Sequence, residues 1–255
     1  MTSTSDAELT RDAFLGGRLH LWQPRRGFRA GIDAILLAAA MPVRAGDDVL
    51  ELGCGAGAAA LALLARVPGA RATGVEVQPV YAALARRNAL ETGLPLEVVE
   101  ADLARVPPGV RGQSYDHVMM NPPYFPAETG TGSVDPGRDT ALRGDTPLPV
   151  WIDAGLRRLR PGGRLTAIQR IERLPEMLAA LDARIGSVAV APLLPRTGRP
   201  PQLFLMSGRK GGRAPFRMTA PVVLHEGARH EADAEDYMPA IAAVLRAGAA
   251  LPLWD

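Results

Sequence analysis

A glycine-rich turn between a short buried strand and an apolar helix restricts the fold of this chain more than any other feature. The predicted strand is Asp48–Leu52, the turn reads Glu51-Leu-Gly-Cys-Gly-Ala-Gly57, and an Ala/Leu-rich helix continues to Arg66. Glycines allow a sharp turn here and allow a ligand to come close, where any Cβ would clash. Such a unit is typical of α/β proteins that bind a nucleotide-like ligand at the end of a parallel sheet.

The alternation of strands and helices continues along most of the chain. Further strands are predicted at 72–76, 96–100, 115–120, 164–169, 187–192 and 202–208, and helices at 31–41, 79–91, 150–159 and 174–184. Residues 161–163 (Pro-Gly-Gly) are expected to form a turn, and the polar segment 125–147 a substrate loop. This alternation predicts an α/β, Rossmann-like fold with a mostly parallel sheet and helices on both faces. We divide the chain into an N-terminal extension (1–28), a catalytic domain (29–225) and an acidic tail with a helix (226–255).

Composition argues against several classes of protein. No run of eighteen apolar residues occurs, so we expect no membrane span, and the polar N-terminus lacks a signal-peptide pattern. A single cysteine, Cys54, excludes an internal disulfide framework and predicts a reducing, cytoplasmic location. No metal site is expected, because His20, His225 and His230 show no metal-ligand spacing. His117 lies inside the strand 115–120 and is expected to be a core residue rather than a catalytic one.

Acidic residues follow the glycine turn at the ends of the next two strands. Glu76 ends the strand 72–76, at the spacing where a carboxylate reaches a ribose diol. Asp102 follows the strand 96–100 and can accept a hydrogen bond from an adenine amino group, while the backbone N–H of Leu103 meets a ring nitrogen. A simpler alternative is that Asp102 caps a turn. The pattern therefore predicts a site for a ligand that contains adenosine.

The identity of that ligand depends on the residue that opens the glycine turn. Glu51 favours a cationic cofactor, S-adenosylmethionine, and would repel the pyrophosphate of a dinucleotide. Residues 53–58 nevertheless also fit the pattern GxGxxA, so an NAD-dependent oxidoreductase stays open at this point. The cofactor-binding candidates from the motifs are Glu51, Gly53, Gly55, Gly57, Glu76, Asp102, Leu103 and Asn121.

The sequence Asn121-Pro122-Pro123-Tyr124 follows the fourth predicted strand directly, and it points to the chemistry. An aromatic amine is a poor nucleophile, because its lone pair is delocalised into the ring. The side-chain oxygen of Asn121 and the carbonyl of Pro122 can accept the two amine hydrogens and concentrate electron density on nitrogen. Prolines stiffen the turn, so both acceptors are fixed in advance, and Tyr124 can stack on an extruded base. We predict that these four residues are catalytic.

Together these motifs resemble class I methyltransferases, and more closely the bacterial family that methylates N6 of the adenine just 3′ of the anticodon in a valine tRNA. The segments that carry the resemblance are 23–24, 31–37, 51–57, Glu76, Asn88, Asp102, 121–125, 159–163, 196–210 and 221–225. The resemblance implies a seven-stranded sheet whose last strand is antiparallel, and S-adenosylmethionine as cofactor. It also implies that the segment from Arg29 to Asp33 closes over cofactor and target base, with Asp33 as a further cofactor contact.

The distribution of charge suggests a nucleic-acid partner. Between residues 157 and 217 there are thirteen Arg or Lys and only three acids, a pattern that suits a polyanion but also fits an Arg-rich composition. Phe28 and Trp22 could stack on a base, although packing beneath the N-terminal segment is the simpler expectation. Candidate RNA contacts are Arg29, Arg138, Arg196, Arg199, Arg209 and Lys210.

Several other functions fit parts of this pattern. A protein-glutamine N5-methyltransferase also acts on a planar nitrogen, that of a side-chain amide, but such enzymes usually carry a helical N-terminal domain. A guanine-N2 methyltransferase of ribosomal RNA uses a similar motif, and a DNA adenine methyltransferase would need a larger recognition domain. An NAD-dependent oxidoreductase and an RNA-binding protein without activity are the alternatives from other classes. A tRNA adenine-N6 methyltransferase is the function that the residues favour.

Overall fold

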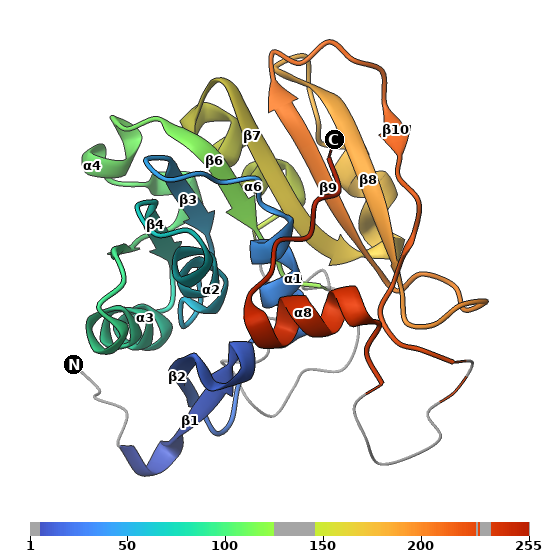
Figure 1. Ribbon diagram of the computed structural model, residues 1–255. Helices are drawn as coiled ribbons and strands as arrows, with labels where there is room; N and C mark the ends of the chain where they lie inside the picture. Colours follow the sequence, from blue (N-terminus) through green and yellow to red (C-terminus); the bar gives the residue numbers. More distant parts are fainter. Residues whose placement is uncertain (1–5, 125–145, 228, 230–235, 255) are drawn as a thin grey trace, which may run out of the picture.

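A computed structural model of the chain describes residues 6–124, 146–227, 229 and 236–254. Seven strands form the body of one sheet: β3 (Asp48–Leu52), β4 (Arg71–Glu76), β5 (Leu96–Glu100), β6 (Tyr115–Met120), β7 (Leu159–Arg170), β8 (Ile185–Leu194) and β9 (Leu203–Lys210). Their order across the sheet is β8-β9-β7-β6-β3-β4-β5 (Figure 1). β9 runs antiparallel to β7 and β8, whereas the neighbours from β7 to β5 are parallel.

This arrangement confirms the predicted Rossmann-like fold, including the antiparallel last strand. The sheet is larger than the seven strands expected, because two short strands, β10 (Arg217–Met218) and β11 (Val222–Val223), pair parallel with β8. The chain after β9 runs back along the open edge of β8, and these pairs use part of its free hydrogen-bonding edge.

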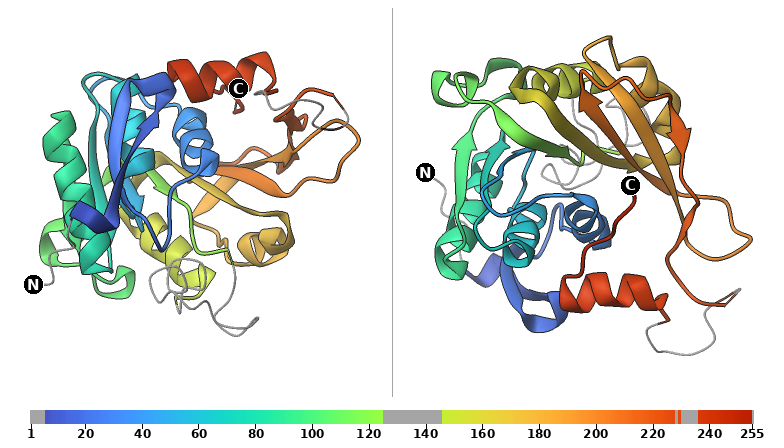
Figure 2. Two further views of the ribbon diagram at one scale, coloured as in Figure 1. Left: turned by 90° about the horizontal axis from the view of Figure 1, so that it is seen from below. Right: turned by 45° about the horizontal axis from the view of Figure 1, so that its top comes forward.

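Helices cover both faces of the sheet (Figure 1, Figure 2). One face carries α1 (Ile32–Ala40), α2 (Ala58–Arg66) and α3 (Pro79–Thr92), and the other α4 (Pro108–Arg111), α6 (Leu148–Arg158) and α7 (Leu174–Ala179). In β6, Met119 packs into the first layer, whereas Val118 and Met120 pack into the second. Successive side chains of a strand point to opposite faces, so residues 118–120 of this central strand, which are buried on both sides, are all apolar.

Two predicted boundaries were wrong. The helix expected to reach residue 184 ends at Ala179, since Asp182 and Arg184 form a hydrogen-bonded turn that leads into β8. The turn expected at 161–163 lies within β7, which begins at Leu159 and shifts register against β6. Glycine there permits close approach, because a Cβ on Gly163 would lie 2.9 Å from the Asp116 carbonyl oxygen. The predicted loop 125–147 falls outside the described residues, except for its last two.

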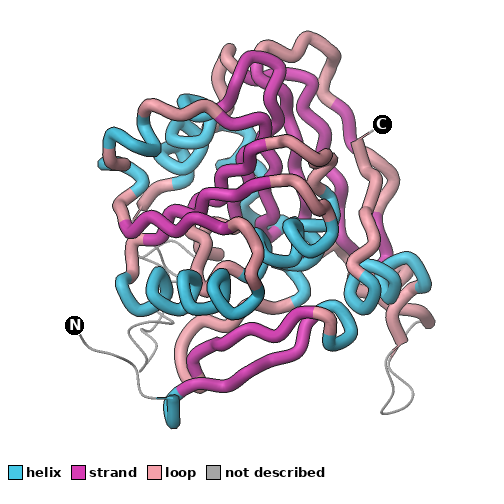
Figure 3. The backbone as a smooth tube through the Cα atoms, turned by 60° about the vertical axis from the view of Figure 1, so that its left-hand side comes forward, coloured by secondary structure: helices cyan, strands magenta, loops and turns pink. Residues whose placement is uncertain are grey.

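The N-terminal residues, expected to be an extension, form an antiparallel hairpin of β1 (Leu9–Phe14) and β2 (Leu19–Pro24), separate from the main sheet (Figure 3). Asn88 on α3 holds this hairpin in place. Its fully buried amide accepts from the Trp22 backbone N–H at 2.7 Å and donates to the carbonyls of Trp22 and Ala56. The hairpin is thereby tied to the glycine turn. Trp22 packs there as expected, with its ring beneath Arg87.

The C-terminal residues close the structure against α1. Helix α8 (Pro239–Ala247) packs on α1, and the segment after α8 donates hydrogen bonds to backbone carbonyls at the C-terminal end of α1. Leu251 N–H donates to Ala39 at 2.9 Å, and the Trp254 indole N–H donates to Ala40 at 2.7 Å. Such terminal carbonyls have no partner within a helix, so these bonds satisfy groups that would otherwise be buried unpaired. No helix in the described part of the chain is long and apolar enough to cross a membrane.

We expect Trp254→Ala to lower the free energy of unfolding by about 3–5 kcal/mol, through lost packing and an unpaired Ala40 carbonyl. Urea denaturation measures the effect. Leu90→Ala is the control, because Leu90 is 83% exposed whereas Trp254 is 8% exposed. Equal stability of the two variants would show that the C-terminal segment does not hold α1.

Candidate active site

A cavity of about 340 Å³ lies at the carboxyl edge of β3, β4 and β6. Its walls come from the glycine turn after β3, the residues that follow β4 and β5, the start of the segment after β6, and the residues around β2 and α1. Carboxyl edges of parallel sheets are where α/β folds bind ligands. Three acids and no basic residue occur among the lining residues that the structure describes, which include Gln23, Phe28, Glu51, Glu76, Asp102, Asn121 and Trp151.

The glycine turn has a backbone that requires glycine. Gly53, Gly55 and Gly57 have φ values of 66°, 54° and 85°, in the left-handed region that other residues adopt rarely. A Cβ on Gly53 would lie 2.5 Å from the Trp151 ring. Cys54 is buried and packs so tightly on β4 that a Cβ on Gly74 would lie 2.6 Å from its sulfur. The turn thus presents bare backbone to the cavity.

Glu51 lies beneath this turn rather than in open solvent. Its carboxyl group is buried and accepts one hydrogen bond, from the Ala60 backbone N–H at 3.0 Å. Burial raises the pKa of Glu51 to about 8, and the nearby charge of Glu76 adds to the increase. In the protein without ligand the Glu51 carboxyl is therefore largely protonated at neutral pH, and a cation bound in the cavity would favour its ionised form.

Glu76 and Asp102 both bind backbone N–H groups at the cavity wall. The Glu76 carboxyl group accepts hydrogen bonds from the backbone N–H groups of Gly55 at 2.8 Å and Gln78 at 2.9 Å. Burial raises the pKa of Glu76, although these hydrogen bonds oppose the shift. Asp102 caps the short helix η3 (Leu103–Arg105) by accepting from the Ala104 N–H at 2.9 Å. Asp102 therefore does cap a turn, the simpler alternative, and it also lines the cavity.

Asn121 is held by a carboxylate from α1. Its Nδ2 donates to Asp33 Oδ2 at 2.9 Å, and the Tyr124 hydroxyl donates to the same oxygen. The Asn121 side-chain oxygen, Oδ1, is buried and has no hydrogen-bond partner among the described residues. Burial and the Asp33 charge raise the pKa of Tyr124 well above its usual range, so the hydroxyl stays protonated and remains a donor. Asp33, expected at the cofactor, thus contacts the Asn-Pro-Pro-Tyr segment and is not among the cavity-lining residues.

The two prolines are held from the opposite side by residues that sequence reasoning missed. Gln169, fully buried near the end of β7, donates to the carbonyls of Pro122 at 3.0 Å and Pro123 at 3.2 Å. Arg173, the last residue of η4 (Ile171–Arg173), donates to the Pro123 carbonyl at 2.7 Å. The same strand also carries Arg164 and Thr166, so the polar character of Gln169 did not single it out or indicate a partner.

The candidate RNA contacts lie in different places. Arg209 and Lys210 are at the amino edge, away from the cavity, because β9 is antiparallel and Arg209 pairs with Arg164 near the amino end of β7. Lys210 also donates to two backbone carbonyls, those of Leu156 at 2.8 Å and Leu159 at 2.7 Å. Neither is placed to contact a base at the cavity.

The remaining candidates differ in how fully they are paired. Arg196 forms an ion pair with Asp236 at 2.5 Å, and Arg29 forms one with Asp12 at 2.7 Å. Arg199, in the turn after β8 at the carboxyl edge, has no side-chain partner within the described residues. Arg138 falls outside them.

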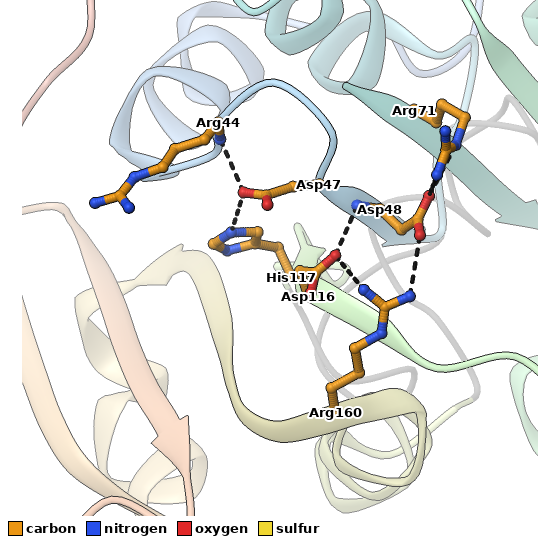
Figure 4. Close-up of polar contacts among 7 residues, drawn as sticks. All are labelled: Arg44, Asp47, Asp48, Arg71, Asp116, His117 and Arg160. Carbon is orange, nitrogen blue, oxygen red and sulfur yellow. Dashed lines mark hydrogen bonds and ion pairs between the residues drawn. The ribbon is translucent and has the colours of Figure 1, made fainter. Parts of the chain in front are cut away.

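A second polar cluster occupies the amino edge of the sheet (Figure 4). Arg160 bridges Asp48 at 3.1 Å and Asp116 at 2.5 Å, and His117 contacts Asp47 at 3.2 Å. Burial lowers the pKa of His117 although Asp47 opposes the shift. These residues join strand starts, so His117 is a structural residue as expected. Among the described residues no group of three or more His, Cys, Asp or Glu side chains could hold a metal ion.

Comparisons with known proteins find methyltransferases. A family described as "Methyltransferase domain" matches residues 49–129. The tRNA1(Val) (adenine(37)-N6)-methyltransferase of Porphyromonas gingivalis is 29% identical over 84% of this chain and 88% of that protein. The release factor glutamine methyltransferase of Deinococcus radiodurans is 33% identical over 64% of this chain and 59% of that protein.

Solved structures show the same similarity. A predicted O-methyltransferase from Agrobacterium tumefaciens superposes with a TM-score of 0.70 at 28% identity, over 86% of this chain and 98% of that one. An S-adenosylmethionine-dependent O-methyltransferase from Thermotoga maritima shares the fold, with a TM-score of 0.53 at 18% identity.

We expect Glu51→Gln to flatten the dependence of stability on pH. Above pH 4.5 the carboxyl of Glu51 in the unfolded chain loses its proton, whereas the folded protein keeps it until about pH 8. The free energy of unfolding of the wild type therefore falls across this window, by up to about 1.4 kcal/mol per pH unit from this group. Glu51→Gln lacks this contribution.

Urea denaturation of the protein without ligand, repeated across that pH window, measures the difference. Glu97→Gln removes an exposed carboxyl and should leave the wild-type dependence intact. Parallel curves for Glu51→Gln and the wild type would contradict the assignment.

Proposed function

We propose that this chain, a class I S-adenosylmethionine-dependent methyltransferase, methylates the exocyclic amine of an unpaired adenine in RNA. The name of the Porphyromonas gingivalis relative supplies the candidate base, adenine 37 of tRNA1(Val). The observation that carries the proposal is the buried side-chain oxygen of Asn121, which lacks a partner at the wall of the cavity.

The cavity fits the cofactor on two counts. The left-handed glycines leave the cavity wall without side chains: at Gly55 an added Cβ would meet only the Phe28 ring, at 3.9 Å, and would otherwise occupy cavity space. Buried Glu51 and Glu76 favour a ligand with positive charge, whereas a dinucleotide would bring a pyrophosphate to a wall without a basic residue among its described members. Glu76 would hold the ribose hydroxyls, and Asp102 with the Leu103 N–H the adenine. When bound, S-adenosylmethionine supplies an electrophilic methyl group.

Asn121 would accept the first hydrogen of the target amine. A carboxylate can only accept hydrogen bonds, so Asp33 binds the Nδ2 donor of the Asn121 amide. The Oδ1 acceptor of the amide is then left for the substrate. A buried acceptor without a partner costs about 1–3 kcal/mol, and an N–H donor at that place recovers the cost. The amide is therefore oriented before the substrate arrives, and the amine nitrogen is aimed without rearrangement of the protein.

The Pro122 carbonyl would accept the second hydrogen. Gln169 occupies one lone pair of this oxygen, and a carbonyl has two. Bonds from Gln169 and Arg173 on one side, and from Asp33 on the other, fix the turn between them. Two rigid acceptors select a planar NH₂ group, and they pull electron density toward its nitrogen. A base in a loop reaches such a site at lower cost than a paired base.

A protein amide is the second candidate, favoured by the similarity to the release factor glutamine methyltransferase. A glutamine side chain also ends in a planar NH₂ group, which the same two oxygens could accept. The chain covers 59% of the length of that relative. In the part that the structure describes, residues 9–24 before α1 form a hairpin, whereas glutamine methyltransferases usually carry a helical domain there.

Incubation of the protein with labelled S-adenosylmethionine and either total RNA or total protein separates the candidates. We expect label in RNA, recovered as N6-methyladenosine after digestion. Asn121→Ala should lower turnover by at least about a hundredfold, because the amine loses an acceptor, with cofactor affinity largely retained. Label in protein alone, or full activity of Asn121→Ala, would refute the proposal.

Asp33→Asn tests the orientation of the amide. An asparagine at this position can donate to the Asn121 oxygen and occupy the acceptor. We expect kcat to fall by about tenfold to a hundredfold, with cofactor affinity by calorimetry unchanged. Tyr124→Phe keeps the bond between Asp33 and Asn121 and should retain more activity than Asp33→Asn. Wild-type kcat for Asp33→Asn would show that Asp33 does not position Asn121.

A further inference from the structure

The segment between β2 and α1 forms part of the cavity rim and is rich in arginine. It reads Arg25-Arg26-Gly27-Phe28-Arg29, and we refer to residues 25–29 as the arginine arm. Phe28 lines the cavity, as do Gln23 and Ala30 on either side of the arm. The arm therefore borders the cavity that Asn121 also lines.

The backbone of the arm is fixed. Phe28 N–H donates to the Tyr81 hydroxyl at 2.7 Å, and that hydroxyl donates back to the Phe28 carbonyl at 3.1 Å. Ala30 N–H donates to the side-chain oxygen of buried Gln23 at 2.8 Å. Because α3 and β2 anchor the arm at these points, its side chains project from a defined place on the rim.

Arginine predominates in the stretch of sequence that contains the arm. Residues 9–30 contain five arginines and one acid, Asp12. Asp12 neutralises Arg29, whereas Arg25 and Arg26 are exposed. Arg25 donates from Nε to the Ala7 carbonyl, which leaves its terminal NH₂ groups for another acceptor. The Arg26 guanidinium has no hydrogen-bond or ion-pair partner in the part of the chain that the structure describes.

These charges differ from those of the basic stretch at 196–210. There, Arg196 is paired with Asp236, Lys210 is bound to backbone carbonyls, and Arg209 lies at the opposite edge of the sheet. The arm instead combines exposed guanidinium groups with direct contact to the cavity. Guanidinium groups match phosphate oxygens in geometry, and phosphate contacts fix the register of a nucleic acid.

We propose that Arg25 and Arg26 bind the backbone phosphates that flank the target nucleotide, so that the arginine arm docks the RNA strand at the cavity. This inference rests on the proposed function and adds the surface that holds the substrate. The acidic cavity would repel a phosphate, so the base enters while its backbone stays on the basic rim.

The double variant Arg25→Ala/Arg26→Ala tests this role. The probe is a fluorescently labelled RNA hairpin with an unpaired adenine in its loop, and anisotropy gives its affinity over a series of KCl concentrations. We expect binding about tenfold weaker at low salt. The slope of log affinity against log salt should become shallower by about one unit for each arginine. Calorimetry should show unchanged affinity for S-adenosylmethionine.

Arg209→Ala/Arg213→Ala removes the same charge at the amino edge and should bind the probe as the wild type does. Wild-type affinity and slope in the arm variant would overturn the inference, as would equal weakening by both double variants, which would indicate net charge alone. If wild-type protein neither binds nor methylates RNA, the proposed function fails as well. If RNA is bound and methylated equally by wild type and arm variant, only the docking role fails.

Discussion

The hydrogen bond between the Asn121 amide and the Asp33 carboxylate is the contact on which the site depends. It brings the beginning of α1 against the end of β6, two elements that are far apart in the sequence. Because the carboxylate accepts a hydrogen bond from the amide nitrogen, the orientation of the amide oxygen is fixed as well. A polar atom is thus left buried and unsatisfied in the free protein, and such an atom is rare unless a ligand completes it.

Charge is separated between the interior and the rim of the cavity. Inside, burial raises the pKa of Glu51 to about 8 and raises that of Glu76, so a positive ligand would favour their ionised forms, which suits a cationic methyl donor. Outside, Arg25 and Arg26 are exposed and belong to the same segment as Phe28, which lines the cavity. Under the proposed docking role, a polyanion would be attracted to this surface and kept out of the donor site. The two substrates would then bind side by side, since each would meet the opposite sign of charge.

Local sequence patterns predicted the body of the fold and much of the site. The glycine turn, the strand before Asn121 and the acids at strand ends are each encoded within a few residues, where the periodicity of apolar residues and backbone geometry decide the outcome. The contacts made by Asp33 and Gln169 are different in kind. Each is a single polar residue whose partner comes from another element, so its role follows only from the tertiary structure.

The errors have equally physical causes. The hairpin at 9–24 has two strands of six residues, in which apolar and polar side chains alternate only weakly. Leu9, Leu19 and Leu21 are the leucines that its strands bury. Arg209 and Lys210 became candidate RNA contacts because charge was counted along the chain. The antiparallel direction of the last strand, which was expected, places its end at the amino edge, away from the cavity. Basic residues that are close in the sequence can therefore lie at opposite edges of the sheet.

Helix α1 has its first turn at the Asn121 amide and its last turn under Trp254, which lies 214 residues after Ala40 in the sequence. The element that supplies Asp33 is thus also held by a contact of very long sequence separation. Closing such a contact costs loop entropy, and a high proportion of such contacts goes with slow folding. We therefore expect the buried acceptor of Asn121 to be in place only after both ends of α1 have been fixed.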